Sequence, residues 1–249
     1  MTQPNDPSTR EAARRFLLDP RHRRLRAFHE CGHAVWLFLD GREAEILYVE
    51  IAPTDFGPGI HDFDTGVIAY RGWSYTAGWV LRGHGRKEQL SRAARCVAFA
   101  FAGAVCESMS TGSRDPTEIW EEALRNEWEF HVEGATTFSD NPRLEEMDFG
   151  QALRVVYAIY PTKDQWVDEI PLRHAKYLMR AAQWTIETFS NPDVWQVVEA
   201  LASEFDPVTV DRLDGDRVRQ IISETWVGRC NECIPLHRLG PKWRRRYGC

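Results

Sequence analysis

Apolar residues return every three to four positions along much of the chain, the spacing that predicts helices. In the first clear segment Leu25, Phe28 and Val35 follow this spacing, and a helix is expected over 22–39, ending at Asp40-Gly41. Further helices are expected over 8–19, 87–109, 116–130, 144–160, 170–190, 191–205 and 217–226. Two segments, 45–51 and 65–70, have the composition of strands. The pattern predicts a mainly α protein of the α+β class, with a small β-sheet beside the helix at 22–39.

The helix expected over 87–109 has an unusually apolar centre. Residues 96–105 carry no charged side chain, which predicts burial on nearly all sides. Cys96 and Cys106 are expected to be small core residues there. The segments expected to be loops are 52–64, 74–85, 110–115 and 131–142.

Composition narrows the class of protein. The chain has 249 residues, 43% of them hydrophobic, enough for one good core or two small ones. A net charge of −6 gives no overall case for nucleic-acid binding. No apolar run approaches the roughly 20 residues of a membrane span, and the polar start of the chain lacks the core of a signal peptide. The six cysteines fit a reducing compartment, so a cytoplasmic protein is expected.

Three segments are expected along the chain. Residues 1–20 form an arm with a short helix, 21–226 form the main domain, and 227–249 form a basic tail that contains cysteines. No P-loop pattern occurs, so we expect no nucleotide motor in this chain.

The helix at 22–39 carries the pattern His-Glu-x-x-His at His29, Glu30 and His33. Two histidines four residues apart lie on one helical face, so both can bind one metal ion. Glu30 is placed to act as general base, taking a proton from a zinc-activated water and passing it to the leaving amine. Cys31 points about 200° away from His29 on the helix, so we expect it to pack in the core.

A catalytic zinc needs a third protein ligand. Chemistry alone does not choose this third ligand. The candidates are His61, His84, His131 and His174, together with many carboxylates. The tail offers a second, weaker pattern, a fragment of zinc-knuckle spacing formed by Cys230, Cys233, His237 and Cys249. The competing interpretation of that tail is a set of incidental thiols.

The segment 24–35 resembles the start of the peptidase domain of the FtsH family, the AAA zinc metalloproteases. The similarity continues in order through 101–108, through 148–152 and through the helices from His174 to Ile222. The resemblance implies a zincin-like metallopeptidase domain with Asp148 as the third zinc ligand. Asp140 and Glu146 are the fallbacks, because the interval from His33 to Asp148 is longer than usual in the family. Glu107, in the second of these segments, is a candidate to accept a hydrogen bond from a metal-bound histidine.

The expected function is that of a zinc-dependent endopeptidase whose substrate is a polypeptide. Without a motor, such an enzyme cuts only flexible or unfolded segments, or needs a separate unfoldase as partner. Either of the two expected strands could hold an extended substrate by its backbone, and the segment 66–73 is preferred. One alternative is a non-catalytic protein that keeps the peptidase fold and binds peptides or a partner. Another is a metal-dependent hydrolase of bonds other than peptide bonds.

Overall fold

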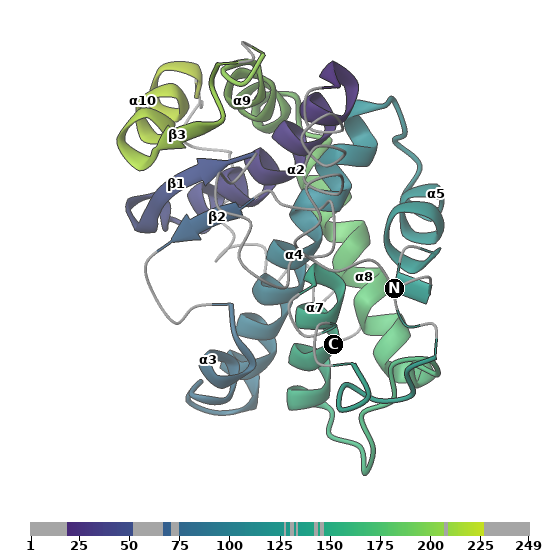
Figure 1. Ribbon diagram of the computed structural model, residues 1–249. Coiled ribbons are helices and arrows are strands. Elements are labelled where there is room, and N and C mark those ends of the chain that lie inside the picture. Colours follow the sequence, from purple (N-terminus) through teal and green to yellow (C-terminus); the bar gives the residue numbers. More distant parts are fainter. Residues whose placement is uncertain are drawn as a thin grey trace, which may run out of the picture. The chain divides into compact units, whose positions relative to one another are not determined.

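Helices make up most of the described chain, and three short strands form one antiparallel sheet (Figure 1). The structure, a computed structural model, describes residues 19–51, 67–70, 75–126, 128–129, 132, 134–141, 144, 147–206 and 209–226. Its α-helices are α2 (Pro20–Leu39), α3 (Ala77–Leu81), α4 (Arg86–Ser110), α5 (Pro116–Glu118), α7 (Asp148–Ile159), α8 (Leu172–Phe189), α9 (Pro192–Ser203) and α10 (Gly215–Thr225). A 3-10 turn η1 (Glu43–Glu45), a π-helix η2 (Ile119–Asn126) and the strands β1 (Ile46–Glu50), β2 (Val67–Tyr70) and β3 (Arg212–Asp214) complete the fold. The prediction of a mainly helical protein with a small sheet is confirmed.

The described residues fall into two compact units. The first unit contains α2, η1, β1 and β2 from the early chain and α9, β3 and α10 from the late chain. The second contains the elements between them, α3 to α8. The predicted boundaries at residues 20 and 226 adjoin chain ends that are not described, so that division stays a prediction.

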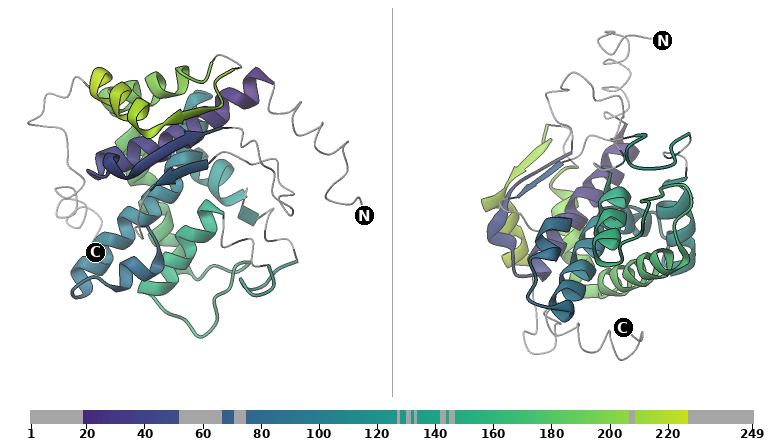
Figure 2. Two further views of the ribbon diagram at one scale, coloured as in Figure 1. Left: turned by 60° about the vertical axis from the view of Figure 1, so that its left-hand side comes forward. Right: turned by 90° about the horizontal axis from the view of Figure 1, so that it is seen from below.

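The sheet of the first unit has the strand order β2-β1-β3, with both pairings antiparallel (Figure 2). The central residue Val49 is paired with Ile68 on one side and with Leu213 on the other. Helices α2 and α10 pack beside the sheet, and α9 packs against α2 through a stack of Phe28 on Trp195 at 5.5 Å. The strands predicted at 45–51 and 65–70 are confirmed, and β3 is an element that the sequence pattern did not indicate.

Helix α4 is the centre of the second unit and packs against both α7 and α8. Its predicted burial is confirmed, since Cys96 and Cys106 are 2% and 0% exposed. By length and composition α4 is apolar enough to cross a membrane, but 72% of its apolar window is buried inside the protein. Such burial accounts for the apolar centre by core packing.

Three predicted elements differ in detail. The segment 74–85, expected to be a loop, contains the short helix α3, which Thr76 caps by accepting a hydrogen bond from the Trp79 N–H. The described residues of the segment 116–130 are helical as predicted, but the helix begins as α5 and continues as the π-helix η2. Helix α7 begins at Asp148, four residues later than expected. The predicted helix at 8–19 and loop at 52–64 lie almost wholly outside the described residues.

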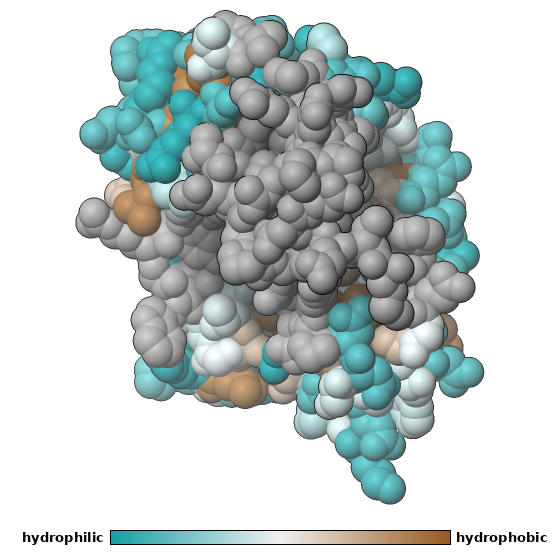
Figure 3. Space-filling model, viewed as in Figure 1, coloured by the Kyte–Doolittle hydropathy of each residue, from teal (hydrophilic) through white to brown (hydrophobic). Residues whose placement is uncertain are grey.

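The described surface is largely polar on the face that Figure 3 shows, where apolar residues form small separate areas. Large apolar side chains that are exposed are few among the described residues; they are Leu47, Leu81, Trp166, Leu172 and Met179. Scattered exposed side chains of this kind are ordinary for a folded protein.

Candidate metal centre

Helix α2 carries the His-Glu-x-x-His motif on a well-anchored backbone. Asp19 caps its first turn by accepting a hydrogen bond from the Arg21 N–H, and Pro20 occupies the first helical position. One turn later the buried guanidinium of Arg23 donates to the carbonyls of Phe205 and Val210 and to the carboxylate of Asp211. These contacts fix the start of α2 against the late chain segment of the same unit, two turns before His29.

The two histidines lie side by side on one face of α2, as their spacing requires. Their ring centroids are 5.1 Å apart and their planes are inclined at 66°. His33 is buried at 4% exposure and His29 is half-buried. A pair of imidazoles that is sheltered from water and held by one helix is well placed to bind a metal ion.

Glu30 and Cys31 follow His29 on the same helix and are both buried, at 6% and 1% exposure. Burial raises the pKa of the Cys31 thiol well above its usual range, and the nearby charge of Glu30 raises it further. The thiol is therefore protonated at neutral pH, as expected of a cysteine packed in the core. The prediction that Cys31 packs in the core is confirmed.

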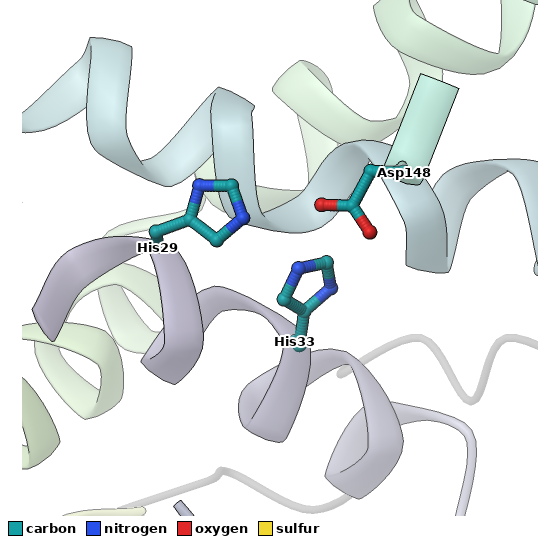
Figure 4. A group of neighbouring side chains, drawn as sticks. All are labelled: His29, His33 and Asp148. Atoms are coloured by element: carbon teal, nitrogen blue, oxygen red, sulfur yellow. The ribbon is translucent and has the colours of Figure 1, made fainter. Parts of the chain in front are cut away.

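Asp148 is the first residue of α7, and Met147 is its N-cap residue. A helix N-terminus favours a carboxylate, because the free N–H groups and the helix dipole present positive charge there. The ligand atoms of His29, His33 and Asp148 all lie within 4.8 Å of one another, and Figure 4 shows the three side chains turned toward one another. Within the described part of the chain, this is the one group of three that could hold a metal ion.

The donor set fits a metal ion by its chemistry. Two imidazole nitrogens and one carboxylate oxygen are the ligands of three-ligand zinc sites that keep one position open. Bond lengths near 2.0–2.1 Å would place the donor atoms about 3.3 Å apart around the ion. Atoms that lie within 4.8 Å reach such a spacing by small side-chain rotations.

The other candidates for third ligand are not part of this group. His84 is exposed, and the ring of His174 makes a hydrogen bond of 2.7 Å from Nε2 to the carbonyl of Tyr160. The carboxylate of Asp140 accepts from the backbone N–H groups of Thr136 and Thr137, which hold its pKa below the usual range. The remaining sequence candidates, His61, His131 and Glu146, lie outside the described residues.

Two further site predictions stay open. Glu107 is half-buried near the end of α4, and its expected hydrogen bond to a metal-binding histidine stays a prediction. The tail ligands Cys230, Cys233, His237 and Cys249 lie outside the described residues.

The motif did not reveal what holds Asp148 in place. Phe149 stacks on Trp128 at 4.9 Å between centroids, and Gly150 approaches the carbonyl of Leu144. The sequence does carry one signal of this close approach. Gly150 stands inside an otherwise apolar helical stretch, two residues after the predicted ligand Asp148.

No protein-family model matches the chain, and a search of curated proteins found no match. The resemblance to the FtsH family therefore rests on the motif residues themselves.

Proposed function

We propose that this protein is a zinc-dependent endopeptidase of zincin-like type that hydrolyses flexible or unfolded polypeptide segments. The observation that carries the proposal is the group of His29, His33 and Asp148, with Glu30 in the same motif. Because its motif segments resemble those of the FtsH peptidase domain, we propose that domain as its relative. The identity of the ion as zinc rests on the composition of the donor set.

In this proposal His29, His33 and Asp148 bind zinc, which when bound polarises the scissile carbonyl and activates a water molecule. The carboxylate of Glu30 accepts the proton of the attacking water. Glu30 then donates this proton to the amine nitrogen of the leaving peptide. The burial of Glu30, at 6% exposure, suits this task because a proton on a sheltered carboxylate is lost to bulk water slowly.

The backbone of β2 is the proposed place for an extended substrate. Among the described residues, β2 pairs with β1 alone, and α2 packs against β2 within the same unit. A strand with one unpaired edge offers N–H and C=O groups to which an extended peptide can add as a further strand. This contact requires an extended backbone, which explains the preference for flexible or unfolded segments. A separate unfoldase is then the natural partner for folded substrates.

The test of the proposal combines metal content with turnover. Purified protein is expected to hold about one zinc per chain by mass spectrometry, and to cleave an unfolded fluorescent casein. The variant Glu30→Gln should keep zinc and the fold while losing turnover by roughly 10²–10⁴-fold, because it removes the general base alone. Glu224→Gln is the control, since Glu224 is exposed on α10 and bonds only Gln220 among the contacts described.

Unchanged turnover in Glu30→Gln would contradict the proposed mechanism. Zinc binding with no cleavage of any peptide by the unsubstituted protein would instead favour the non-catalytic binding protein. Cleavage of ester or amide compounds other than peptides would favour the wider class of metal-dependent hydrolases.

A further inference from the structure

Gly150, two residues after Asp148, lies closer to a backbone carbonyl than any other residue type would allow. A Cβ atom placed on Gly150 would lie 1.5 Å from the carbonyl oxygen of Leu144 and 2.7 Å from its carbonyl carbon. It would also lie 3.4 Å from Cζ3 of Trp128. Real Cβ atoms essentially never come within 3.0 Å of such an atom, so any side chain here must displace the backbone.

Position 150 requires glycine because of this close contact and not because of its backbone conformation. The glycines with positive φ among the described residues are Gly41, Gly85, Gly112 and Gly134, so Gly150 has ordinary helical backbone. Glycine inside a helix lowers stability by roughly 0.5–1 kcal/mol relative to alanine. At position 150 that cost is offset by the approach of Leu144, which is 1% exposed.

Aromatic packing also holds this turn. Phe149 stacks on Trp128 with the ring planes at 21°, and it also contacts Phe101 at 5.6 Å. The indole of Trp128 is fixed in turn, because its Nε1 donates a hydrogen bond of 3.0 Å to the carbonyl of Val167. The first turn of α7 therefore has a carbonyl against Gly150 and an aromatic stack against Phe149.

Both contacts are made by the two residues that follow Asp148, whose carboxylate belongs to the candidate metal centre. A shift of the first turn of α7 would disturb the Leu144–Gly150 contact and the Phe149–Trp128 stack. Metal ligands must be held within about 0.5 Å of their working positions. A Cβ that lies 1.5 Å from the Leu144 oxygen must move to at least 3.0 Å from it, and this displacement is larger than that tolerance.

We propose that Gly150 is a positioning residue for the metal centre: by admitting the Leu144 carbonyl against α7, it sets where Asp148 presents its carboxylate. The inference rests on the proposed function, since it takes Asp148 as a metal ligand. Trp128 supports the same placement through its stack on Phe149.

The test measures zinc affinity by competition with a chromophoric chelator, in full-length protein and its variants. Gly150→Ala is expected to weaken zinc binding by roughly ten- to a hundredfold, as loss of a ligand-orienting contact does. Val156→Ala is the matched control: Val156 lies two turns later on α7 at 0% exposure, and its truncation lowers stability without touching the turn at Asp148. Its zinc affinity should stay within about twofold of the unsubstituted protein, because substitutions at well-separated positions act independently.

A spectroscopic signature separates positioning from general loss of stability. Co²⁺ replaces Zn²⁺ in such sites, and its visible absorption depends on the number and arrangement of its ligands. Gly150→Ala should give the spectrum of Asp148→Ala, while Val156→Ala gives that of the unsubstituted protein. If Gly150→Ala does not fold, Trp128→Phe takes its place, since it keeps an aromatic ring but removes the bond to Val167; a severalfold loss of affinity is expected.

The outcomes distinguish this inference from the proposed function. Unchanged zinc affinity in Gly150→Ala, or in Trp128→Phe where that variant is used, beside a large loss in Asp148→Ala, would overturn the positioning role and leave the metal centre intact. An unchanged affinity in Asp148→Ala would overturn Asp148 as the third ligand, and the positioning role with it.

Discussion

The imidazole rings of His29 and His33 lie 5.1 Å apart between centroids, with their planes inclined at 66°. Four residues separate them on α2, so each is one helical turn from the other and both face the same side. The pair supplies two of the three ligands of the candidate metal centre. Because this geometry exists only in the folded protein, a metal ion bound there stabilises the fold.

Zinc should raise the stability of this protein through His33. Free zinc at about one hundred times its dissociation constant adds about 2.7 kcal/mol to the free energy of unfolding, because it binds the folded state. Urea denaturation with added zinc, and again with chelator, measures this increment. His33→Ala should abolish it, whereas His84→Ala, which alters an exposed histidine outside the group, should keep it. An increment that survives in His33→Ala would place the metal elsewhere.

Removal of Arg23 should destabilise the first unit. Its side chain is 6% exposed and bonds two backbone carbonyls besides Asp211, so Arg23→Ala leaves buried acceptors without their donor. We expect a loss of about 3 kcal/mol in the free energy of unfolding. Asp211→Ala should cost less than Arg23→Ala, because the guanidinium keeps its hydrogen bonds to the carbonyls of Phe205 and Val210. Equal losses in both variants by urea denaturation would contradict this division.

His174 should make stability fall in mild acid. Burial lowers the pKa of His174 from its usual value, the hydrogen bond to Tyr160 opposes this, and the charge of Arg173 adds to the lowering. Below about pH 6.5 the unfolded chain therefore binds a proton at this position that the folded protein does not, and stability falls as pH falls. His174→Gln should reduce this slope, by at most about 1.4 kcal/mol per pH unit. Urea denaturation between pH 5 and 8 checks it, and identical slopes would rule the effect out.

Tyr157 should make the stability of the folded protein fall at alkaline pH. Burial and the charge of Asp168 raise the pKa of Tyr157 to about 12, and its hydroxyl donates a hydrogen bond of 2.6 Å to the carbonyl of Trp166. The unfolded chain loses this proton near pH 10, so stability should fall as pH rises from there toward 12. Tyr157→Phe removes both this dependence and about 1 kcal/mol of stability at neutral pH. Ultraviolet titration of tyrosine ionisation in the two proteins provides the measurement.

Two glycines should respond to alanine in opposite ways. A Cβ on Gly215 would lie 2.1 Å from the carbonyl oxygen of Ile46, so Gly215→Ala must separate α10 from β1 and should cost about 2 kcal/mol. A Cβ on Gly78 meets only Oγ1 of Thr76, at 3.8 Å. Because alanine is the better helix former, Gly78→Ala should add about 0.5 kcal/mol. Thermal unfolding of both variants tests the pair, and a stable Gly215→Ala would contradict the contact.

Local pattern was sufficient wherever an element is long and periodic. The bounds of α2, α4, α8 and α9 lie within about two residues of those that the apolar spacing predicts, since each helix has many positions to define its face. Strand β3 escaped prediction because it has three residues, of which Leu213 alone is buried. Strand β3 pairs with β1, which is remote in sequence, so β3 is a strand because of this pairing and not because of its composition. Helix α7 begins four residues later than predicted, and the carbonyl of Leu144 lies against Gly150 before the helix starts.

The sequence by itself determined the mainly helical class, the helix that carries His29 and His33, and Glu30 in the motif between them. These follow from spacing along one element, where neighbours in sequence are neighbours in space. The tertiary structure decided that Asp148 joins them while Asp140, His84 and His174 do not. It also revealed the close approach at Gly150 and the contacts of Arg23. Such choices depend on chain segments far apart in sequence, whose meeting is set by the packing of whole helices and leaves no period in the local pattern.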